Sequence, residues 1–466
     1  MTERFHLIGI GGIGMSALAS ILLARGAAVS GSDAQESDTT TRLLSQGAKV
    51  SIGHKAELVE GAQRLVVSDA IQPDNPELLR AKQLGLPIQR RSQLLAELME
   101  GSRGLAVAGT HGKTTVTAML AAMLVEAGMD PTVALGGRYE PVGGNARAGR
   151  GPWFVVEACE AYESFLDLRP EIALITNIEA EHLDHHGTEA HLRASFRAFL
   201  HRLLPGGCAV LCADRPELRE IGADLDCEVI TYGTQTEANV RGTGVATAGS
   251  GMTCDLSLDG RPVGALRLGV PGAHNLLNAL GALAAARRAG APLAACQSAM
   301  AAFHGVDRRF QIIGDASGIL VIDDYAHHPT EIAATIDTAR AAFPGRRLIA
   351  VFQPHLYSRT RDFAEGFSEA LGKADLAVLT DIYAAREAPL PGVTVDLISK
   401  PLRARRGEDV VLEMAKEEAA TKLASQVQTG DVVLVMGAGD IGQTAWELAR
   451  RLGIEPTGRP EVATKE

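Results

Sequence analysis

Short apolar runs alternate with longer amphipathic stretches along most of the chain. Residues 5–10 form the first run, which enters a glycine-rich turn and then a helical pattern over residues 15–24, ended by Gly26. A strand, a tight turn and a helix in this succession are typical of parallel sheets covered by helices. The pattern therefore predicts an α/β fold from the first residues onward.

The same alternation returns in two later blocks of the chain. Further strands are expected at residues 27–30, 64–67, 105–108, 153–156, 172–176, 209–211, 319–322, 347–352, 376–379 and 432–436. Between residues 228 and 270 the runs become short and alternating. There, Asp259-Gly260 separates residues 254–258 from 261–268, which predicts a β-hairpin insertion. A helical pattern follows over residues 275–288.

Composition and charge narrow the classes of protein. Hydrophobic residues make up 46% of the chain and charged residues 22%, as in globular proteins. Lys and Arg number 45 against 56 Asp and Glu, so the formal charge is −11, which argues against general nucleic-acid binding. Six cysteines without a C-x-x-C pair are too few for a disulfide scaffold and favour a reducing compartment.

One stretch near the N-terminus has the length of a signal peptide. Residues 5–24 are apolar behind Arg4, but glycines at positions 9, 11, 12 and 14 interrupt the centre, where a signal peptide requires an unbroken apolar run. No other segment has the roughly 18 uninterrupted apolar residues of a membrane span. We therefore expect a cytoplasmic protein that does not cross a membrane.

The strongest chemical motif follows the expected strand at residues 105–108. It consists of Gly109, Thr110, His111, Gly112, Lys113, Thr114 and Thr115. Glycines before Lys-Thr at a helix start surround a polyphosphate with N–H groups, place the lysine on the outer phosphates and the threonine hydroxyl on Mg²⁺. Val107 stands where the full motif has its first glycine. The alternative is a chance G-K-T at a structural turn.

A second glycine motif lies at residues 9–14. Its G-x-G-x-x-G spacing after a strand, with Asp33 about 20 residues further on, predicts a turn that holds the diphosphate of a nucleotide, without indicating NAD. A tight turn with no ligand is the alternative. Residues 437–442 repeat the spacing, and there a structural and a ligand-binding interpretation are equally open.

Length and motifs together predict three domains. At about 150 residues per domain, 466 residues correspond to about three. We expect an N-terminal Rossmann-like domain over residues 1–101 and a central P-loop ATPase-like domain with the small β insertion over 102–313. A C-terminal Rossmann-like domain is expected over residues 314–466.

Acids and histidines gather where strands of the central block should end. Glu157 follows one strand, and a second group follows the next: Glu181, His182, Asp184, His185 and His186. The carboxyl ends of parallel strands border the same crevice as the phosphate loop, so Glu157 and one of the histidines could reach a metal or a phosphate there. Solvated loop charges are the alternative.

A further group follows strands of the C-terminal block. It consists of Asp323, Asp324, Tyr325, His327, His328, His355, Arg359 and Arg361. Histidines and arginines at strand ends suit a carboxylate-bearing substrate and an anionic transition state. Ordinary surface ion pairs are the alternative.

These motifs together resemble the ATP-dependent Mur ligases of peptidoglycan synthesis. The similarity covers residues 9–16, 30–33, 109–115, 176–182, 274–278, 305–311, 323–331, 352–362 and 437–442. Residues 324–331 and 352–355 narrow it to the members that add L-alanine. The resemblance implies that ATP and Mg²⁺ serve a ligase that joins L-alanine to the lactyl carboxylate of UDP-N-acetylmuramate through an acyl phosphate. We expect a monomer or weak homodimer.

The resemblance also implies roles for individual residues. The catalytic residues would be Lys113, Glu157, His182, His327 and Arg359, and the Mg²⁺ ligands Thr114, Glu157 and His182. ATP would be bound by residues 109–115 with Asn177, His274, Asn275 and Asn278. The two other substrates would be bound by Gly11, Gly12, Ile13, Gly14, Ser32, Asp33, Ser68, Arg91, Tyr325, His327 and Arg359.

Two positions depart from the pattern of the family. Many members have Asp-Glu-Ser-Asp after the Glu-Ala pair, whereas here Glu157-Ala158 is followed by Cys159-Glu160-Ala161-Tyr162. Leu356 stands where many relatives have arginine, which leaves Arg359 as the clearer partner for a substrate carboxylate.

Other functions explain parts of the sequence. A nicotinamide-dependent oxidoreductase would account for residues 9–14 and leave residues 109–115 without a role. A non-catalytic nucleotide-sensing module would account for the phosphate loop but not for the strand-end clusters. Within the family, the nearest rival is a ligase that joins a recycled murein peptide to the same UDP-sugar.

Overall fold

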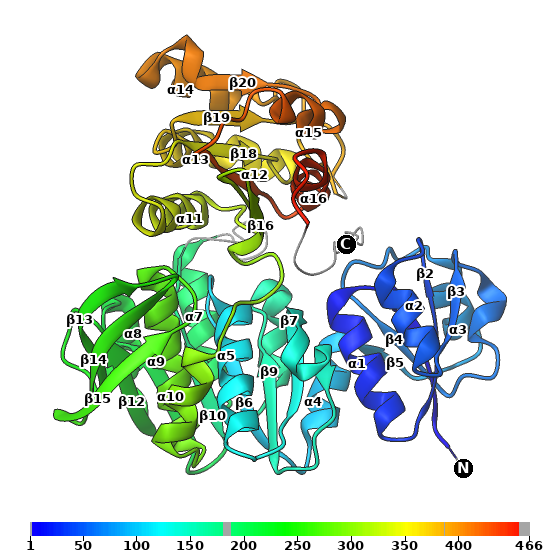
Figure 1. Ribbon diagram of the computed structural model, residues 1–466. Coiled ribbons are helices and arrows are strands. Elements are labelled where there is room, and N and C mark those ends of the chain that lie inside the picture. The colour runs from blue at the N-terminus through cyan, green and yellow to red at the C-terminus, as the bar shows by residue number, and fades with distance from the viewer. Residues whose placement is uncertain (1, 180–187, 386, 456–466) are drawn as a thin grey trace. The chain divides into compact units, whose positions relative to one another are not determined.

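A computed structural model describes residues 2–179, 188–385 and 387–455 of the chain (Figure 1). The described residues divide into two compact units, residues 1–304 and 305–466, and their strands form three sheets. The first two sheets belong to the first unit and the third to the second unit. The predicted α/β class with N-terminal, central and C-terminal parts is confirmed, and the domain boundaries at 101/102 and 313/314 stay predictions.

The first sheet is parallel and has the strand order β3-β2-β1-β4-β5. Its strands are β1 (Arg4–Ile8), β2 (Ala28–Asp33), β3 (Lys49–Ile52), β4 (Arg64–Val67) and β5 (Ile88–Arg90). Its helices are α1 (Ile13–Ala24), α2 (Asp38–Ser45), α3 (Pro76–Gln83) and α4 (Arg91–Met99), with the short η1 (Ala56–Val59). Gly9 has φ +74° and ends β1 before residue 10, so the turn begins earlier than predicted.

The second sheet has the order β15-β14-β13-β12-β11-β10-β6-β9-β7-β8. Its first strands in the chain are β6 (Arg103–Ala108), β7 (Thr132–Tyr139), β8 (Gly144–Arg147), β9 (Trp153–Glu157), β10 (Ile172–Ile175) and β11 (Cys208–Cys212). They are followed by β12 (Glu228–Gly233), β13 (Val240–Ala248), β14 (Gly251–Leu258) and β15 (Arg261–Leu268). The accompanying helices are α5 (Lys113–Glu126), η2 (Glu140–Val142), η3 (Ala161–Asp167), α7 (Glu189–Leu200), α8 (Pro216–Ala223), α9 (Ala273–Arg288) and α10 (Leu293–Ala301).

The predicted hairpin insertion is confirmed as β14 and β15. Its turn residues Asp259 and Gly260 have φ +47° and +75°, and this pair of positive φ angles is the reason that Asp-Gly marks such hairpins. The hairpin extends one edge of the second sheet through β13 rather than standing apart from it. A second hairpin, β7 with β8, was missed because glycines and a proline hide its apolar alternation.

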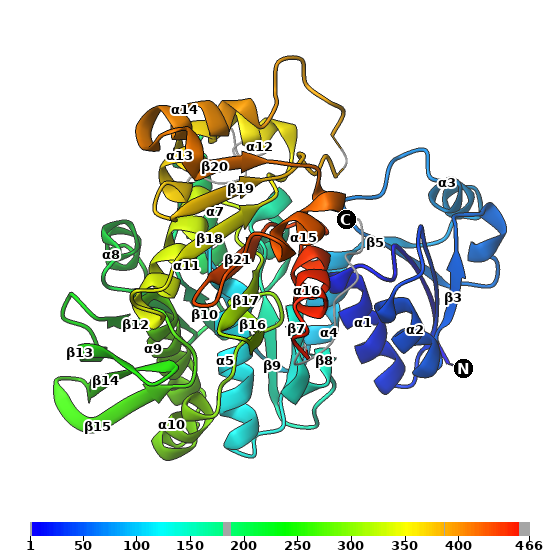
Figure 2. The same ribbon diagram turned by 45° about the horizontal axis from the view of Figure 1, so that its top comes forward.

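The third sheet lies in the second unit and has the order β16-β17-β21-β18-β19-β20 (Figure 2). Its strands are β16 (Gln311–Ala316), β17 (Ile319–Asp324), β18 (Leu348–Phe352), β19 (Leu376–Leu379), β20 (Val411–Glu413) and β21 (Val432–Met436). The helices are α11 (Pro329–Ala342), α12 (Tyr357–Asp362), α13 (Ala364–Leu371), α14 (Asp396–Arg406), η4 (Glu408–Val410), α15 (Lys416–Ala424) and α16 (Gly442–Arg451).

Apolar cores cover both faces of the third sheet. Side chains of α11, α13 and α14 pack on one face, and those of α15 and α16, including Trp446, pack on the other. The strands between them are buried on both sides, which explains their nearly continuous apolar sequence. The pattern predicts an all-parallel sheet, but β16 runs antiparallel to β17, because the short turn at Ser317 and Gly318 cannot make a parallel crossover.

The helices of the described residues are those of a globular α/β protein. None of them combines the length and apolar character that crossing a lipid bilayer requires.

Candidate active site

The loop of residues 109–115 joins β6 to α5 at the carboxyl end of β6. Gly109 has φ +130°, and a Cβ there would lie 2.0 Å from Thr176 Oγ1. Gly112 is the N-cap of α5 with φ +83°, and a Cβ there would lie 2.9 Å from Asn278 Oδ1. Both positions therefore require glycine, for backbone conformation and for space.

The segment after β10 determines the shape of this loop. The Thr110 N–H donates to the Asn177 carbonyl at 3.0 Å, and the His111 N–H donates to Asn177 Oδ1 at 2.9 Å. Thr176 Oγ1 and Asn177 Nδ2 donate to the His111 carbonyl at 2.6 and 3.1 Å. Asn177, expected to bind ATP, thus contacts the loop itself in this structure.

Lys113 lies over its own loop. Its Nζ donates to the Gly109 and Thr110 carbonyls at 2.6 and 2.9 Å and pairs with Glu160 at 3.0 Å. The Glu160 side chain is 1% exposed, so this ion pair is largely withdrawn from water. Glu160 belongs to the segment that departs from the family pattern, and no sequence motif connects it with Lys113.

Oxygen donors suited to a hard cation lie at two element ends near the loop. Thr114 and Thr115 are buried in the first turn of α5. Glu157 ends β9, which pairs with β6, and its Oε2 accepts from the Gly136 N–H at 2.9 Å. Mg²⁺ prefers such hydroxyl and carboxylate oxygens. His182, expected as a third ligand, lies outside the described residues, as do Glu181, Asp184, His185 and His186.

The other residues expected to bind ATP lie at the start of α9. His274 is exposed, whereas Asn275 is buried and its Nδ2 donates to the Pro271 carbonyl at 2.8 Å. Asn278 is the residue that a Cβ at Gly112 would strike, so this helix start lies directly against the phosphate loop.

The glycine turn of residues 9–14 is shaped by Asp33 and Arg91. The Gly11 N–H donates to Asp33 Oδ2 at 2.8 Å, and a Cβ on Gly11 would also lie 2.8 Å from that oxygen. A Cβ on Gly14 would lie 2.9 Å from Arg91 Cδ. The structure therefore brings Asp33, Arg91 and the turn together, with Ser68 just after β4.

Ser32 belongs to a buried polar network that the sequence did not indicate. Its Oγ donates to Glu77 Oε2 at 2.9 Å, and the same carboxylate lies 2.6 Å from His6 Nε2 and 2.9 Å from His54 Nδ1. Burial acts to raise the pKa of Glu77, but the hydrogen bonds from His6, Ser32 and His54 outweigh it and hold the pKa below its ordinary value.

In the second unit, aromatic, histidine and arginine side chains gather at the ends of β17 and β18. His327 Nδ1 lies 2.9 Å from the Tyr325 carbonyl, and Arg359 Nη1 lies 3.3 Å from His355 Nδ1. The rings of His327 and His355 are 6.3 Å apart, so Tyr325, His327 and Arg359 belong to one cluster, as expected. His355 also stacks on Tyr383, a residue that no sequence motif marked.

Leu356 lies beside this cluster in a strained backbone conformation. Its φ is +69°, which is unfavourable for a residue with a Cβ. Hydrogen bonds hold it there: its N–H donates to the Tyr383 carbonyl at 2.9 Å, and its carbonyl accepts from Thr360 Oγ1 at 2.7 Å.

Asp324 connects the start of the second unit to the same strand end. Its carboxylate accepts from the Phe310 N–H at 2.6 Å and from the Ala326 N–H at 2.7 Å. Burial raises the pKa of Asp324 above its ordinary value despite these hydrogen bonds.

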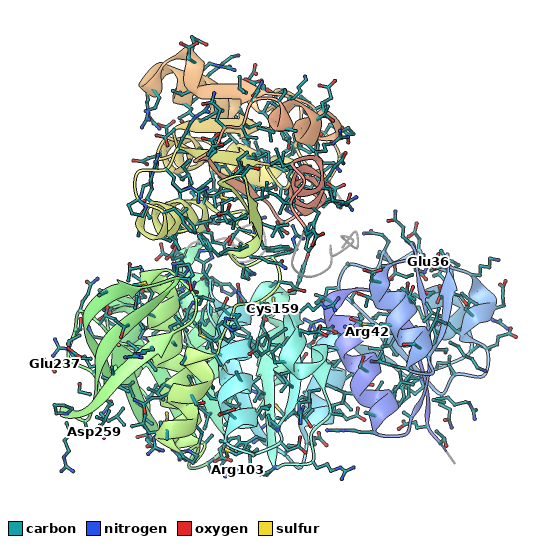
Figure 3. The ribbon with its side chains drawn as sticks, in the orientation of Figure 1. Glu36, Arg42, Arg103, Cys159, Glu237 and Asp259 are labelled. Atoms are coloured by element: carbon teal, nitrogen blue, oxygen red, sulfur yellow. The ribbon has the colours of Figure 1, made fainter. Side chains whose placement is uncertain are left out.

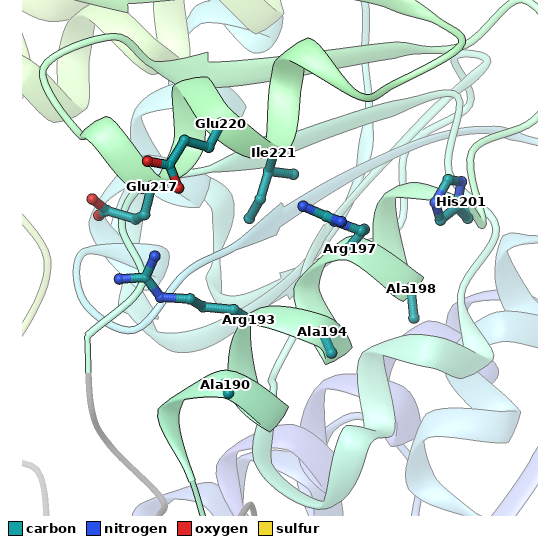
Figure 4. A pocket seen from close by; sticks show the side chains of 9 residues that line it. All are labelled: Ala190, Arg193, Ala194, Arg197, Ala198, His201, Glu217, Glu220 and Ile221. Carbon is teal, nitrogen blue, oxygen red and sulfur yellow. The ribbon is translucent and has the colours of Figure 1, made fainter.

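A surface hollow of about 480 Å³ lies between α7 and α8 (Figure 4). Its lining combines alanines with charged side chains such as Arg193, Arg197 and Glu217, and contains none of the residues expected to bind substrates. Arg193 and Arg197 form ion pairs with Glu189 and Asp224. We therefore interpret the hollow as part of an ordinary charged surface.

Comparisons with known proteins point to one protein family over nearly the whole chain. Residues 4–103, 107–286 and 308–439 match three family models: the Mur ligase family catalytic domain, the Mur ligase middle domain and the Mur ligase glutamate ligase domain. A UDP-N-acetylmuramate–L-alanine ligase of Symbiobacterium thermophilum is 46% identical over 458 residues, which are 97% of this chain and 95% of that protein.

Two solved structures are similar over nearly their full length. The UDP-N-acetylmuramate-alanine ligase MurC of Thermotoga maritima has a TM-score of 0.82 at 30% identity, covering 97% of this chain and 99% of that one. A murein peptide ligase of Psychrobacter arcticus has a TM-score of 0.73 at 25% identity, with the same coverage.

Proposed function

The chain belongs to the Mur ligase family, and from this premise we propose that it joins L-alanine to the lactyl carboxylate of UDP-N-acetylmuramate at the expense of ATP. The observation that carries the proposal is the phosphate loop with Lys113 over it, in a chain that is similar from end to end to an alanine-adding ligase. The product would be a precursor of peptidoglycan.

The reaction needs activation because a carboxylate is a poor acyl donor. A carboxylate oxygen attacks the γ-phosphorus of ATP and ADP leaves, which gives an acyl phosphate. The amine of alanine then attacks the carbonyl carbon and loses a proton, and the tetrahedral intermediate expels phosphate. Positioning and charge stabilisation are the main requirements for the first step.

The loop of residues 109–115 supplies both requirements. Its backbone N–H groups and the start of α5 favour negative charge, and Lys113 is three or four residues from the carbonyls that now hold it. Lys113 would exchange one of these neutral acceptors for a phosphate oxygen. His274, Asn275 and Asn278 would lie on the nucleotide side of the loop.

The donor set near the loop fits Mg²⁺. The Thr114 hydroxyl and the Glu157 carboxylate are hard oxygen ligands at neighbouring element ends, and we propose them as ligands together with His182. Bound there, Mg²⁺ would neutralise charge on the transferring phosphoryl group. Glu157 is held in place by the Gly136 N–H.

The two other substrates would bind through the remaining predicted residues. The turn of residues 9–14, with Ser32, Asp33, Ser68 and Arg91 around it, would hold the diphosphate and the nucleoside of the UDP-sugar. Tyr325, His327 and Arg359 would bind alanine, with the Arg359 guanidinium on its carboxylate. A cytoplasmic location and a monomer or weak homodimer stay predictions.

A phosphate-release assay tests the proposed function. The protein is mixed with ATP, Mg²⁺ and UDP-N-acetylmuramate, and each amino acid and a murein tripeptide are added in turn. We expect phosphate release with L-alanine and none without the UDP-sugar. Preference for the tripeptide would show the peptide-joining activity instead, and reduction of a nicotinamide cofactor with no phosphate release would show an oxidoreductase.

A further inference from the structure

The hairpin of β7 and β8 lies between two predicted substrate sites of the first unit. Strand β7 pairs in parallel with β9, with Val133 opposite Val155, and β9 ends at Glu157. The Gly136 N–H of β7 donates to the Glu157 carboxylate, and a Cβ on Gly136 would lie 2.5 Å from Glu157 Oε2. One strand of the hairpin therefore fixes the predicted metal ligand.

The other strand of the hairpin contacts α1 through Asn145. This side chain lies on β8, and the residue is 1% exposed. Its Nδ2 donates to the Ile13 carbonyl at 2.6 Å and to Ser16 Oγ at 2.9 Å. Ile13 is both the first residue of α1 and part of the predicted diphosphate turn. Asn145 thus belongs to the second sheet, while these hydrogen bonds go to the first domain.

Arg42 belongs to α2 and is labelled in Figure 3. It fixes the orientation of the Asn145 amide. Its Nη2 donates to Asn145 Oδ1 at 2.5 Å, which leaves the amide nitrogen directed at α1. Gly144 makes the approach of Arg42 possible, because a Cβ there would lie 2.2 Å from Arg42 Nη1. The amide is therefore bonded at both ends, in a place from which water is excluded.

We propose that Asn145 is a positioning residue, which holds the diphosphate turn at a fixed distance from Glu157 and the phosphate loop. The inference rests on the proposed function, since it concerns how the acceptor carboxylate of one substrate is aligned with the γ-phosphate of the other. Contacts run from Glu157 through Gly136 and the hairpin to Asn145, and from there to Ile13. Small misplacements of reacting groups lower turnover strongly, even where each substrate still binds.

The test separates positioning from binding with the variant Asn145→Ala. We expect its kcat to fall about tenfold or more, because the Ile13 carbonyl keeps the local donor Ser16 Oγ but loses the hydrogen bond from β8, so the turn of α1 can shift. Dissociation constants for UDP alone and for ADP alone, measured by calorimetry, should stay within about twofold of the wild type, because the variant removes no predicted contact with either nucleotide. A purely structural defect would weaken ADP binding and the thermal transition together with turnover.

Two further variants of the same link sharpen the result. Asn145→Asp keeps the oxygen that accepts from Arg42 but lacks the donor to Ile13, so its kcat should fall as far as that of Asn145→Ala. Arg42→Gln leaves the Asn145 amide donor in place and removes only the hydrogen bond that orients it, so kcat should fall about threefold. Arg42 is partly exposed, and this variant should fold normally.

Asn239→Ala is the control for removing a hydrogen-bonded asparagine side chain elsewhere in the first unit, at an exposed position. Asn239 also makes several side-chain hydrogen bonds, to Thr231 and Asp259, but these stay within the β12–β14 region. Its turnover should equal that of the wild type. If Asn145→Ala is folded and as active as this control, or if Asn145→Asp regains full activity, the positioning role is wrong. If the wild type itself releases no phosphate with UDP-N-acetylmuramate and L-alanine, the proposed function fails instead.

Discussion

Two glycine-rich turns of this protein each lie between a strand and a helix, are alike in their local contacts, and differ in the residue that holds them. In the loop of residues 109–115, Lys113 donates to the carbonyls of Gly109 and Thr110 at 2.6 and 2.9 Å. In the turn of residues 437–442, after β21, Arg308 donates to the carbonyls of Gly437 and Gly439 at 2.8 and 2.9 Å. Each is a cation bonded to two carbonyls, with an acid nearby.

The origin and chemistry of the cation separate the two turns. Lys113 is part of its own loop, and its flexible side chain carries donors that can be redirected to a phosphate. Arg308 comes from the distant start of the second unit, and its planar guanidinium also lies over the Tyr325 ring at 4.9 Å. This arginine is fixed by several partners at once, so it holds the turn rather than exchanging partners.

The packing of the C-terminal turn supports the same distinction. A Cβ on Gly439 would lie 2.7 Å from Gln353 Oε1 and from Tyr383 Cγ, and one on Gly442 would lie 2.9 Å from Asp323 Oδ2. The glycines of residues 437–442 are therefore explained by side chains of the protein itself. The comparison teaches that a glycine-rich turn between a strand and a helix is not by itself a ligand site, while the cation beside it indicates whether a ligand is expected.

Lys113→Ala should have the largest effect. Turnover should fall by about 10²- to 10³-fold, because a charge that stabilises the transition state is lost. The thermal transition should fall as well, because the 1% exposed Glu160 side chain loses its ion-pair partner, but the protein should remain folded at the assay temperature. Phosphate release and a melting curve check both points, and turnover close to that of the wild type would show that this loop does not bind the reacting phosphates.

Arg308→Lys should lower the free energy of unfolding of the second unit by about 2 kcal/mol, because a single ammonium group cannot bond both carbonyls and also keep the contacts that the larger guanidinium makes with Asp323 and the Tyr325 ring. Chemical denaturation measures the change. The control is Arg309→Lys, at a more exposed arginine that also lies over Tyr325, and it should cost less than half as much. Equal losses in both variants would mean that the carbonyl contacts do not hold the turn.

Alanine variants in the two turns with G-x-G-x-x-G spacing test whether the same spacing binds a ligand at residues 9–14 and serves only packing at residues 437–442. In Gly11→Ala the new Cβ would lie 2.8 Å from Asp33 Oδ2, so the turn should shift and the KM for the UDP-sugar should rise about tenfold, with the KM for ATP unchanged. Gly439→Ala should instead lower stability without a specific change in the KM for the UDP-sugar. Steady-state kinetics and melting curves distinguish them; a KM for the UDP-sugar raised in both would remove the distinction.

Glu160→Gln should have the smallest effect. The carboxylate attracts Lys113 and competes with the phosphates for it, so the neutral amide should lower the KM for ATP about threefold. Glu163→Gln, in the same segment, is the control and should leave this KM unchanged. A KM for ATP that rises in Glu160→Gln would indicate that Glu160 assists nucleotide binding.

Much of the fold was predicted because its signals are local. The strands at residues 64–67, 376–379 and 432–436 were predicted with the bounds that the structure has, since each is an apolar run between polar or glycine residues. The Asp259-Gly260 hairpin was predicted from its turn residues. The hairpin of β7 and β8 escaped, because its alternation is broken by Gly136 and Gly137 and is completed only by pairing with β9.

The sequence by itself determined the class of the fold, the phosphate loop and the membership of a ligase family, because these depend on spacings of a few residues. Only the tertiary structure decided which partners those residues have. Glu160 meets Lys113, Glu77 meets His6 and Ser32, and Asn145 meets Ile13 across more than a hundred positions of the chain. Such pairs depend on strand order and on burial, since a polar group excluded from water must find a partner wherever the fold places one.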